Sequence, residues 1–154
     1  MSRPGLTRTL VVERAALILD NPSLGGLNLA ALAESLGVRP PSLYKHIDGM
    51  PGLQRDIMLR AKANLAHALG QSAIGRSHDD AIRALALAYR RWALEHPGQY
   101  PMTVRAPVAG DDDDTTVSSS LSDVVVNVLR GYGLGGDEAV DAVRFLRSSL
   151  HGFV

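Results

Sequence analysis

The sequence predicts an all-α protein in which a small three-helix module is linked by a long helix to a C-terminal helical bundle. Three observations support this. Apolar residues recur at three- and four-residue spacing through most of the chain. Clusters of Gly and Pro separate these periodic segments. No segment of convincing length shows the apolar and polar alternation of a strand, and the valines at 124–126 fall inside a longer helical pattern.

Composition excludes several classes of protein. The 154 residues include no cysteine, which rules out disulfides, a thiolate nucleophile and a cysteine-based zinc site. No apolar run approaches the roughly 20 residues of a membrane span. Charged residues interrupt the N-terminal apolar segment at Arg8, Glu13 and Arg14, unlike a signal peptide. We therefore expect a cytoplasmic protein with no membrane partner.

Charge is distributed unevenly, although the formal net charge is zero. Residues 1–68 contain eight Lys or Arg and five Asp or Glu, a net of +3, and the remainder carries −3. This modest asymmetry is compatible with nucleic acid as a partner of the N-terminal part.

Residues 27–47 predict two short helices joined by a tight turn. Asn28 is suited to cap the first helix, and Leu29, Leu32, Ala33 and Leu36 follow at helical spacing. Gly37 then closes the helix, because a left-handed residue there has little steric cost. Pro41 is the predicted first residue of the second helix, with Arg39 and Pro40 outside it. This layout is a helix-turn-helix, whose second helix enters the DNA major groove.

The flanking segments complete the N-terminal module and its linker. Thr7 is predicted to cap a helix that runs to about Asp20. Pro51 is predicted near the start of a long helix that ends at about Leu69 and connects two domains, residues 1–50 and 51–154.

Four further helices are expected in the distal bundle. Ser77 and Asp80 resemble a capping box ahead of a helix over residues 81–95. Residues 100–109 are expected to form a short helix or turn, followed by a charged surface loop at 111–114. Two helices follow, over residues 121–132 and from an N-cap at Asp137 to about Leu150.

The candidate DNA-binding residues lie on the second helix, at its start, at the cap of the first helix and on the N-terminal arm: Arg3, Asn28, Arg39, Pro40, Pro41, Ser42, Tyr44, Lys45 and His46. Several have alternative roles. Tyr44 could bond a phosphate or serve as a half-buried anchor, and Lys45 could contact phosphate or base or remain solvated. His46 could reach a phosphate or lock the turn, and Ser42 could bond DNA or cap the helix.

Metal sites are not predicted. The four adjacent carboxylates at 111–114 cannot converge on one ion, so a solvated loop is the preferred interpretation. The five histidines are not spaced as zinc ligands. We expect no metal and no cofactor.

Specific short sequences resemble the TetR/AcrR family of transcriptional repressors. In the N-terminal part they are Ala15-Ala16 with Leu19, Leu32-Ala33 with Leu36-Gly37-Val38, and Ser42-Leu43-Tyr44-Lys45-His46. In the distal part, Trp92, His96-Pro97-Gly98-x-Tyr100 and Leu150-His151-Gly152-Phe153 are similar to the branch with a WHG-type C-terminal domain. The resemblance implies a homodimer, an approximately palindromic DNA operator and a small-molecule effector. Members usually run one helix further, so we expect that this chain lacks a last helix.

These expectations combine into a ligand-responsive repressor that is not an enzyme. The candidate effector-pocket residues are Tyr89, Trp92, His96, Tyr100, Met102 and Phe145, for which membership of a plain core is the alternative. A second hypothesis is a small helical enzyme or metal-binding protein whose helix-turn-helix is only a packing motif. An activator, or a repressor without a ligand, is also compatible with the residues.

Overall fold

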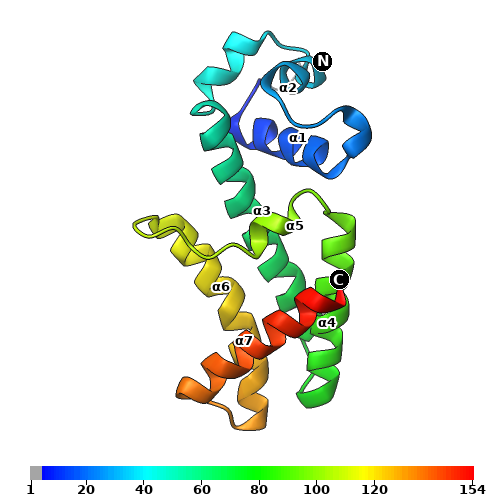
Figure 1. The fold of residues 1–154 in the computed structure, drawn as a ribbon, viewed down its shortest axis with the longest axis vertical. Helices are drawn as coiled ribbons and strands as arrows, with labels where there is room; N and C mark the ends of the chain where they lie inside the picture. The colour runs from blue at the N-terminus through cyan, green and yellow to red at the C-terminus, as the bar shows by residue number, and fades with distance from the viewer. Residues whose placement is uncertain (1–4) are drawn as a thin grey trace. The chain divides into compact units, whose positions relative to one another are not determined.

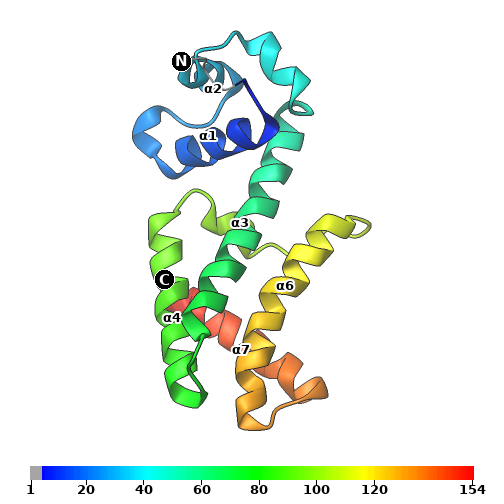
Figure 2. The same ribbon diagram turned by 180° about the vertical axis from the view of Figure 1, so that it is seen from behind.

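The computed structural model describes residues 5–154, and throughout that range the chain is helical without a strand (Figures 1 and 2). The predicted fold class is confirmed. The α-helices are α1 (Arg8–Asp20), α2 (Leu29–Leu36), α3 (Gly49–Ala73), α4 (His78–Glu95), α5 (Tyr100–Thr103), α6 (Asp112–Leu129) and α7 (Gly136–Phe153). Short 3-10 helices are η1 (Pro22–Leu24), η2 (Pro40–Lys45) and η3 (Arg130–Tyr132).

The chain divides into two compact units between Arg60 and Ala61, inside α3. Helix α3 therefore supplies residues to both units. The predicted domain division, 1–50 and 51–154, stays a prediction. Within the described residues, no helix is both long enough and apolar enough to cross a bilayer.

Unit 1 is built from α1, α2, η2 and the first part of α3. Its core consists of side chains with almost no exposed surface: Val11, Ala15, Leu32, Leu43, Leu53 and Ile57. Arg8 forms a bidentate ion pair with Asp56, with Nε 2.9 Å from Oδ2 and an Nη 2.8 Å from Oδ1. Because Arg8 is half exposed, this pair stabilises the unit only slightly.

The capping residues and the glycine in the sequence predicted the positions of α1 and α2 correctly. The Thr7 hydroxyl accepts a hydrogen bond from the Leu10 N–H at 3.2 Å, and the Asn28 Oδ1 accepts one from the Ala31 N–H at 2.8 Å. Gly37 has a φ of 67°, and the Val38 N–H bonds back to the Ala33 carbonyl at 3.0 Å. Both predicted caps and the glycine corner are confirmed.

The cap at Asn28 gives a first testable prediction. Replacing Asn28 by Ala leaves the Ala31 N–H without its acceptor, and we expect a loss of about 1 kcal/mol in the free energy of unfolding. Asn28→Asp keeps the acceptor and should be close to wild type. Urea denaturation of both variants measures the effect, and equal losses in both would contradict the capping role.

Unit 2 is built from the C-terminal part of α3 together with α4, α5, α6 and α7. In both views α4 and α6 flank the C-terminal part of α3, and α7 crosses them on one side (Figures 1 and 2). Nine buried residues form its core: Ala61, Leu65, Leu69, Leu85, Tyr89, Trp92, Ala93, Tyr100 and Leu150.

Several predicted boundaries in unit 2 were wrong. Helix α3 continues through Gly70 to Ala73 instead of ending near Leu69. Helix α4 starts at His78, and the Ser77 side chain makes no capping hydrogen bond, so the predicted capping box is absent. The N-cap of α7 is Gly135, and Asp137 lies in the first turn of that helix.

The predicted charged loop at 111–114 was also wrong. Asp111 is the N-cap of α6, since its Oδ1 accepts a hydrogen bond from the Asp114 N–H at 3.0 Å. The next three aspartates form the first turn of the helix, where negative charge is favourable to the helix dipole. Asp114 is fully buried, which a solvated loop would not allow.

Candidate functional site

The second element of the helix-turn-helix is the 3-10 helix η2 and begins one residue earlier than predicted, at Pro40. Neither proline has an N–H, so Ser42 supplies the first donor, which bonds the Arg39 carbonyl at 2.9 Å. At the other end, the His46 N–H bonds the Leu43 carbonyl at 2.8 Å. We call residues 39–46 the recognition segment.

The recognition segment has one buried and one exposed face. Leu43 has no exposed surface and Ile47 only 3%, and both pack in the core of unit 1. Tyr44 is 60% exposed, so it is not the half-buried anchor considered above. The exposed face therefore presents a phenol and two cationic side chains, Arg39 and Lys45, over a fixed apolar base.

The remaining candidate residues differ in accessibility. Pro40 and Pro41 are exposed beside Arg39, whereas Ser42 and His46 are half-buried. Asn28 is exposed, but its side-chain oxygen is already used as the cap of α2. Arg3 lies outside the described residues. Their roles in DNA binding stay predictions.

A buried ion pair, which sequence reasoning missed, connects α3 to α6 in unit 2. The Lys62 Nζ lies 2.5 Å from the Asp114 Oδ1, and both side chains are at most 1% exposed. Lys62 also donates to the Ser118 hydroxyl at 3.0 Å, and the Val108 N–H donates to the other Asp114 oxygen at 3.1 Å. Both charges are thereby compensated inside the protein, as buried charges must be.

The pKa of Asp114 reflects this environment. Burial alone would raise the pKa of the carboxyl group, because it disfavours the charged form. The hydrogen bond from Lys62 opposes that effect, together with those from Val108 and Ser118 and the positive charge of Lys62. The result is a pKa below the ordinary value, so the carboxylate is the stable form.

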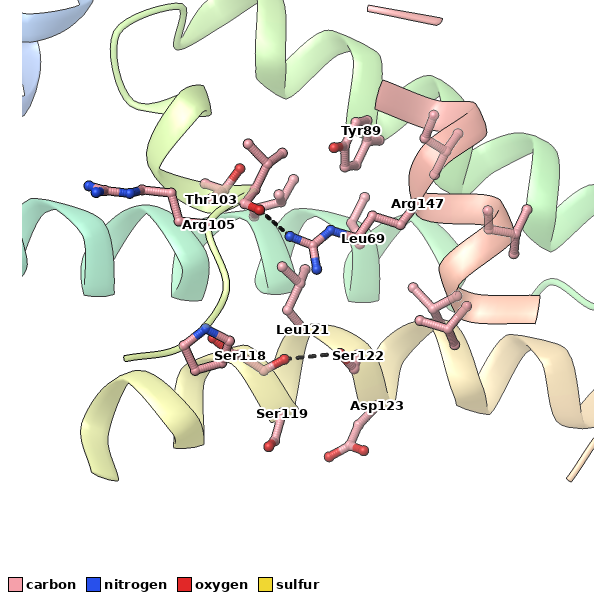
Figure 3. Close-up of a pocket in the computed structure, with 17 residues that line it drawn as sticks. Leu69, Tyr89, Thr103, Arg105, Ser118, Ser119, Leu121, Ser122, Asp123 and Arg147 are labelled. Carbon is pink, nitrogen blue, oxygen red and sulfur yellow. Dashed lines mark hydrogen bonds between the residues drawn. The ribbon is translucent and has the colours of Figure 1, made fainter. Parts of the chain in front are cut away.

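Unit 2 contains a cavity of about 310 Å³ (Figure 3). It is partly open and is lined by α3, α4, α6, α7, the end of α5 and the segment that follows. The apolar part of its lining is Leu65, Leu69, Val104, Pro107, Leu121, Val125, Val143, Leu146 and Leu150. Polar groups come from Tyr89, Thr103, Arg105, Arg147, Asp123 and serines of α6. Apolar walls with a few polar groups are typical of small-molecule sites.

The cavity includes Tyr89 among the predicted effector-pocket residues, whereas the other five are not in its lining. Trp92 and Tyr100 are core residues, His96 lies against the Trp92 ring at 4.7 Å between centroids, and Phe145 is 71% exposed. Met102 is half-buried.

A chain of aromatic hydrogen bonds lies behind the Tyr89 wall of the cavity. The Tyr89 hydroxyl is 3.1 Å from the Tyr100 hydroxyl, which lies 2.5 Å from the His151 Nδ1. Burial raises the pKa of Tyr89 well above its ordinary value, and the bond to Tyr100 adds to the shift. Tyr89 is therefore neutral, and its hydroxyl is already bonded to Tyr100.

Known proteins resemble both parts of the chain. Residues 82–154 match the family model described as "Tetracyclin repressor-like, C-terminal domain". The uncharacterized HTH-type transcriptional regulator Rv0681 of Mycobacterium tuberculosis is 38% identical, and the alignment covers the whole of this chain and 72% of that protein. This chain belongs to the TetR family of transcriptional regulators.

Further comparisons agree with membership of the TetR family. The uncharacterized HTH-type transcriptional regulator YobS of Bacillus subtilis is 36% identical over 98% of this chain and 78% of its own length. The solved structure of SCO7222, a TetR from Streptomyces coelicolor, has a TM-score of 0.72 and 25% identity, covering 96% of this chain and 68% of that one. The WHG-type branch stays a prediction.

Family membership decides between the two classes of function considered for the sequence. TetR-family regulators bind DNA operators through a helix-turn-helix and are not enzymes. The chain is accordingly a helix-turn-helix transcriptional regulator, and the enzyme hypothesis is set aside. Across residues 5–154, no three His, Asp or Glu side chains are grouped as metal ligands would be.

Proposed function

We propose that this TetR-family regulator is a cytoplasmic homodimeric repressor that binds an approximately palindromic operator and is released from it by a small-molecule effector. The observation that carries the proposal is the recognition segment. It exposes Arg39, Tyr44 and Lys45 while Leu43 fixes it to the core. Cationic and phenolic donors on a rigid element are suited to phosphate contacts that orient a protein on DNA. The similarity of residues 82–154 to a repressor C-terminal domain supports repression.

The effector part of the proposal rests on the cavity and on α3. Leu65 and Leu69 of α3 line the cavity, and Lys62 of the same helix bonds Ser118, another lining residue. Helix α3 begins at Gly49, three residues after the recognition segment. We infer that an effector which displaces α3 changes the separation of the two recognition segments in the dimer. Successive major grooves require a separation of roughly 34–36 Å, so displacement weakens operator binding.

Selection of bound duplexes from a random pool tests the proposal. The purified chain should enrich a sequence with two inverted half-sites, because a two-fold symmetric dimer reads a two-fold symmetric site. Half-site centres should lie about one helical turn, or a multiple of it, apart. Enrichment of a single unrepeated site would contradict the dimer. No enrichment at moderate salt would contradict operator binding by this chain.

A further inference from the structure

The cavity of unit 2, whose lining is mostly apolar, has one charged group directed towards its centre. Figure 3 shows the Arg147 guanidinium near the centre of the cavity, reaching from α7 towards the segment that follows α5. The other two charged lining residues, Arg105 and Asp123, point away from this centre in the same view. The inward charge of the cavity is therefore positive.

Arg147 is bonded in a way that leaves most of its donors available. One Nη donates to the Val104 backbone carbonyl, and among the described residues no carboxylate is paired with this guanidinium. A guanidinium has five N–H donors in a planar fork, which matches the two oxygens of a carboxylate. A backbone carbonyl orients the group without neutralising its charge.

The surroundings of Arg147 favour an anion with an apolar body. Leu69, Leu121, Leu146 and Leu150 supply apolar surface on which the body of a ligand can pack, while Arg147 itself is exposed at the rim of this surface. Tyr89 and Arg147 both line the cavity, and the positive charge of Arg147 acts on the pKa of Tyr89 against the larger effect of burial. A single guanidinium thus lies beside an apolar surface, an arrangement suited to a single carboxylate on a hydrocarbon body.

We propose that the effector of this regulator is an apolar monocarboxylate, bound with its carboxylate on the Arg147 guanidinium and its hydrocarbon part among the leucines of α3, α6 and α7. This inference rests on the proposed effector function of the cavity. The volume of about 310 Å³ is at the lower end of the range for ligand pockets, so the ligand is a small acid. The hydrocarbon part of this acid can be an aliphatic chain or an aromatic ring, because both are apolar.

The test compares acids with their neutral and cationic counterparts. Decanoate and 4-phenylbutyrate, their primary amides and the corresponding amines are titrated into the full chain and followed by calorimetry. We expect at least one of the two acids to bind about tenfold or more tightly than its amide, because a carboxylate offers the guanidinium two negatively charged oxygens and an amide offers one neutral oxygen. Binding of decanoate would indicate an aliphatic effector, and binding of 4-phenylbutyrate would indicate an aromatic one.

Two variants of α7 make the test specific. Arg147→Gln should weaken acid binding about tenfold or more and leave amide binding unchanged. The matched control is Arg144→Gln, since Arg144 is an exposed arginine on the same helix that pairs with Asp141 and does not line the cavity. It should bind the acid as wild type does. Circular dichroism verifies that both variants fold.

Three results would overturn the inference: equal binding of acids and amides, preference for the amines, or full acid affinity in Arg147→Gln. Absence of binding by every member of the panel would also overturn it. None of these outcomes affects enrichment of a palindromic duplex, which tests the proposed operator function separately. Loss of that enrichment together with retained acid binding would instead contradict the operator proposal alone.

Discussion

Asp114→Asn should lower the free energy of unfolding by about 3–5 kcal/mol, the usual cost of breaking a buried ion pair at one partner. The variant leaves the Lys62 ammonium, which is 1% exposed, without a counter-charge in the interior of unit 2. The Ser118 hydroxyl and an amide oxygen cannot neutralise a full positive charge. Chemical denaturation of the wild type and the variant measures the difference.

Two controls separate the ion pair from other effects at the start of α6. Asp112→Asn removes an exposed carboxylate from the same first turn, and its cost should stay below about 1 kcal/mol, the size of a helix-dipole effect. The double variant Lys62→Met with Asp114→Leu removes both charges and should recover much of the lost stability, because apolar replacement of a buried pair is often neutral. A double variant as unstable as Asp114→Asn would contradict this account.

The lowered pKa of Asp114 adds a pH dependence to the stability of unit 2. An unfolded aspartate titrates at about pH 3.9, and the folded one titrates lower. Above about pH 5 both states are deprotonated, so the stabilisation is complete. It is lost progressively as the pH falls below about 4 and through the folded pKa, because in that range the unfolded state binds more protons than the folded state. Asp114→Asn should show a weaker dependence between pH 5 and 3 than wild type.

Tyr44→Ala combined with Lys45→Ala should reduce affinity for the selected duplex about a thousandfold, because the proposed dimer then loses four phosphate or base contacts of roughly 1 kcal/mol each. Both side chains are exposed on the recognition segment, so their removal leaves the core intact. Fluorescence anisotropy at several salt concentrations measures the affinity. Lys45→Ala alone should lower the slope of log affinity against log salt by about 1.8, because each protomer of the proposed dimer loses one phosphate contact.

The control for this prediction is Arg83→Ala, because Arg83 is an exposed cation of α4 in the other compact unit. It should retain wild-type affinity and salt dependence. A loss of affinity in Arg83→Ala equal to that of the double variant would indicate nonspecific electrostatics in place of contacts by the recognition segment.

The sequence predicted best where structure is decided locally. The cap at Asn28 and the corner at Gly37 depend on residues within one turn of each other, so their neighbours in the chain were sufficient. Gly70 shows the opposite case. A glycine inside a helix costs about 1 kcal/mol relative to alanine, which tertiary packing can offset. Here α3 continues past Gly70, which lies against Val124 of α6.

The Lys62–Asp114 pair could be predicted only in part. Lys62 follows Met58 by four residues and precedes Leu65 by three, so its position on the apolar stripe of α3 was a signal for a buried partner. Asp114 precedes Ser118 by four residues and Leu121 by seven, so the three side chains share one face of α6. The two residues are 52 positions apart, and nothing in the sequence alone could pair them.

The candidate DNA-binding residues and the effector residues differ in how well their surroundings could be predicted. The alternation of buried Leu43 with exposed Tyr44 and Lys45 follows from one short helix. The cavity is formed by separate segments, and its aromatic candidates were chosen by residue type. Trp92 and Tyr100 fill the core, while Phe145 is one residue out of register with the inward face of α7 at Leu146.

Amide hydrogen exchange of the wild-type chain, measured with and without the selected duplex, tests the DNA-binding role of the recognition segment most directly. We predict slower exchange at the non-proline amides of residues 39–46 when the duplex is bound, because that segment then lies against DNA. Unchanged exchange across residues 39–46, with protection elsewhere in the chain, would contradict the DNA-binding role of the recognition segment.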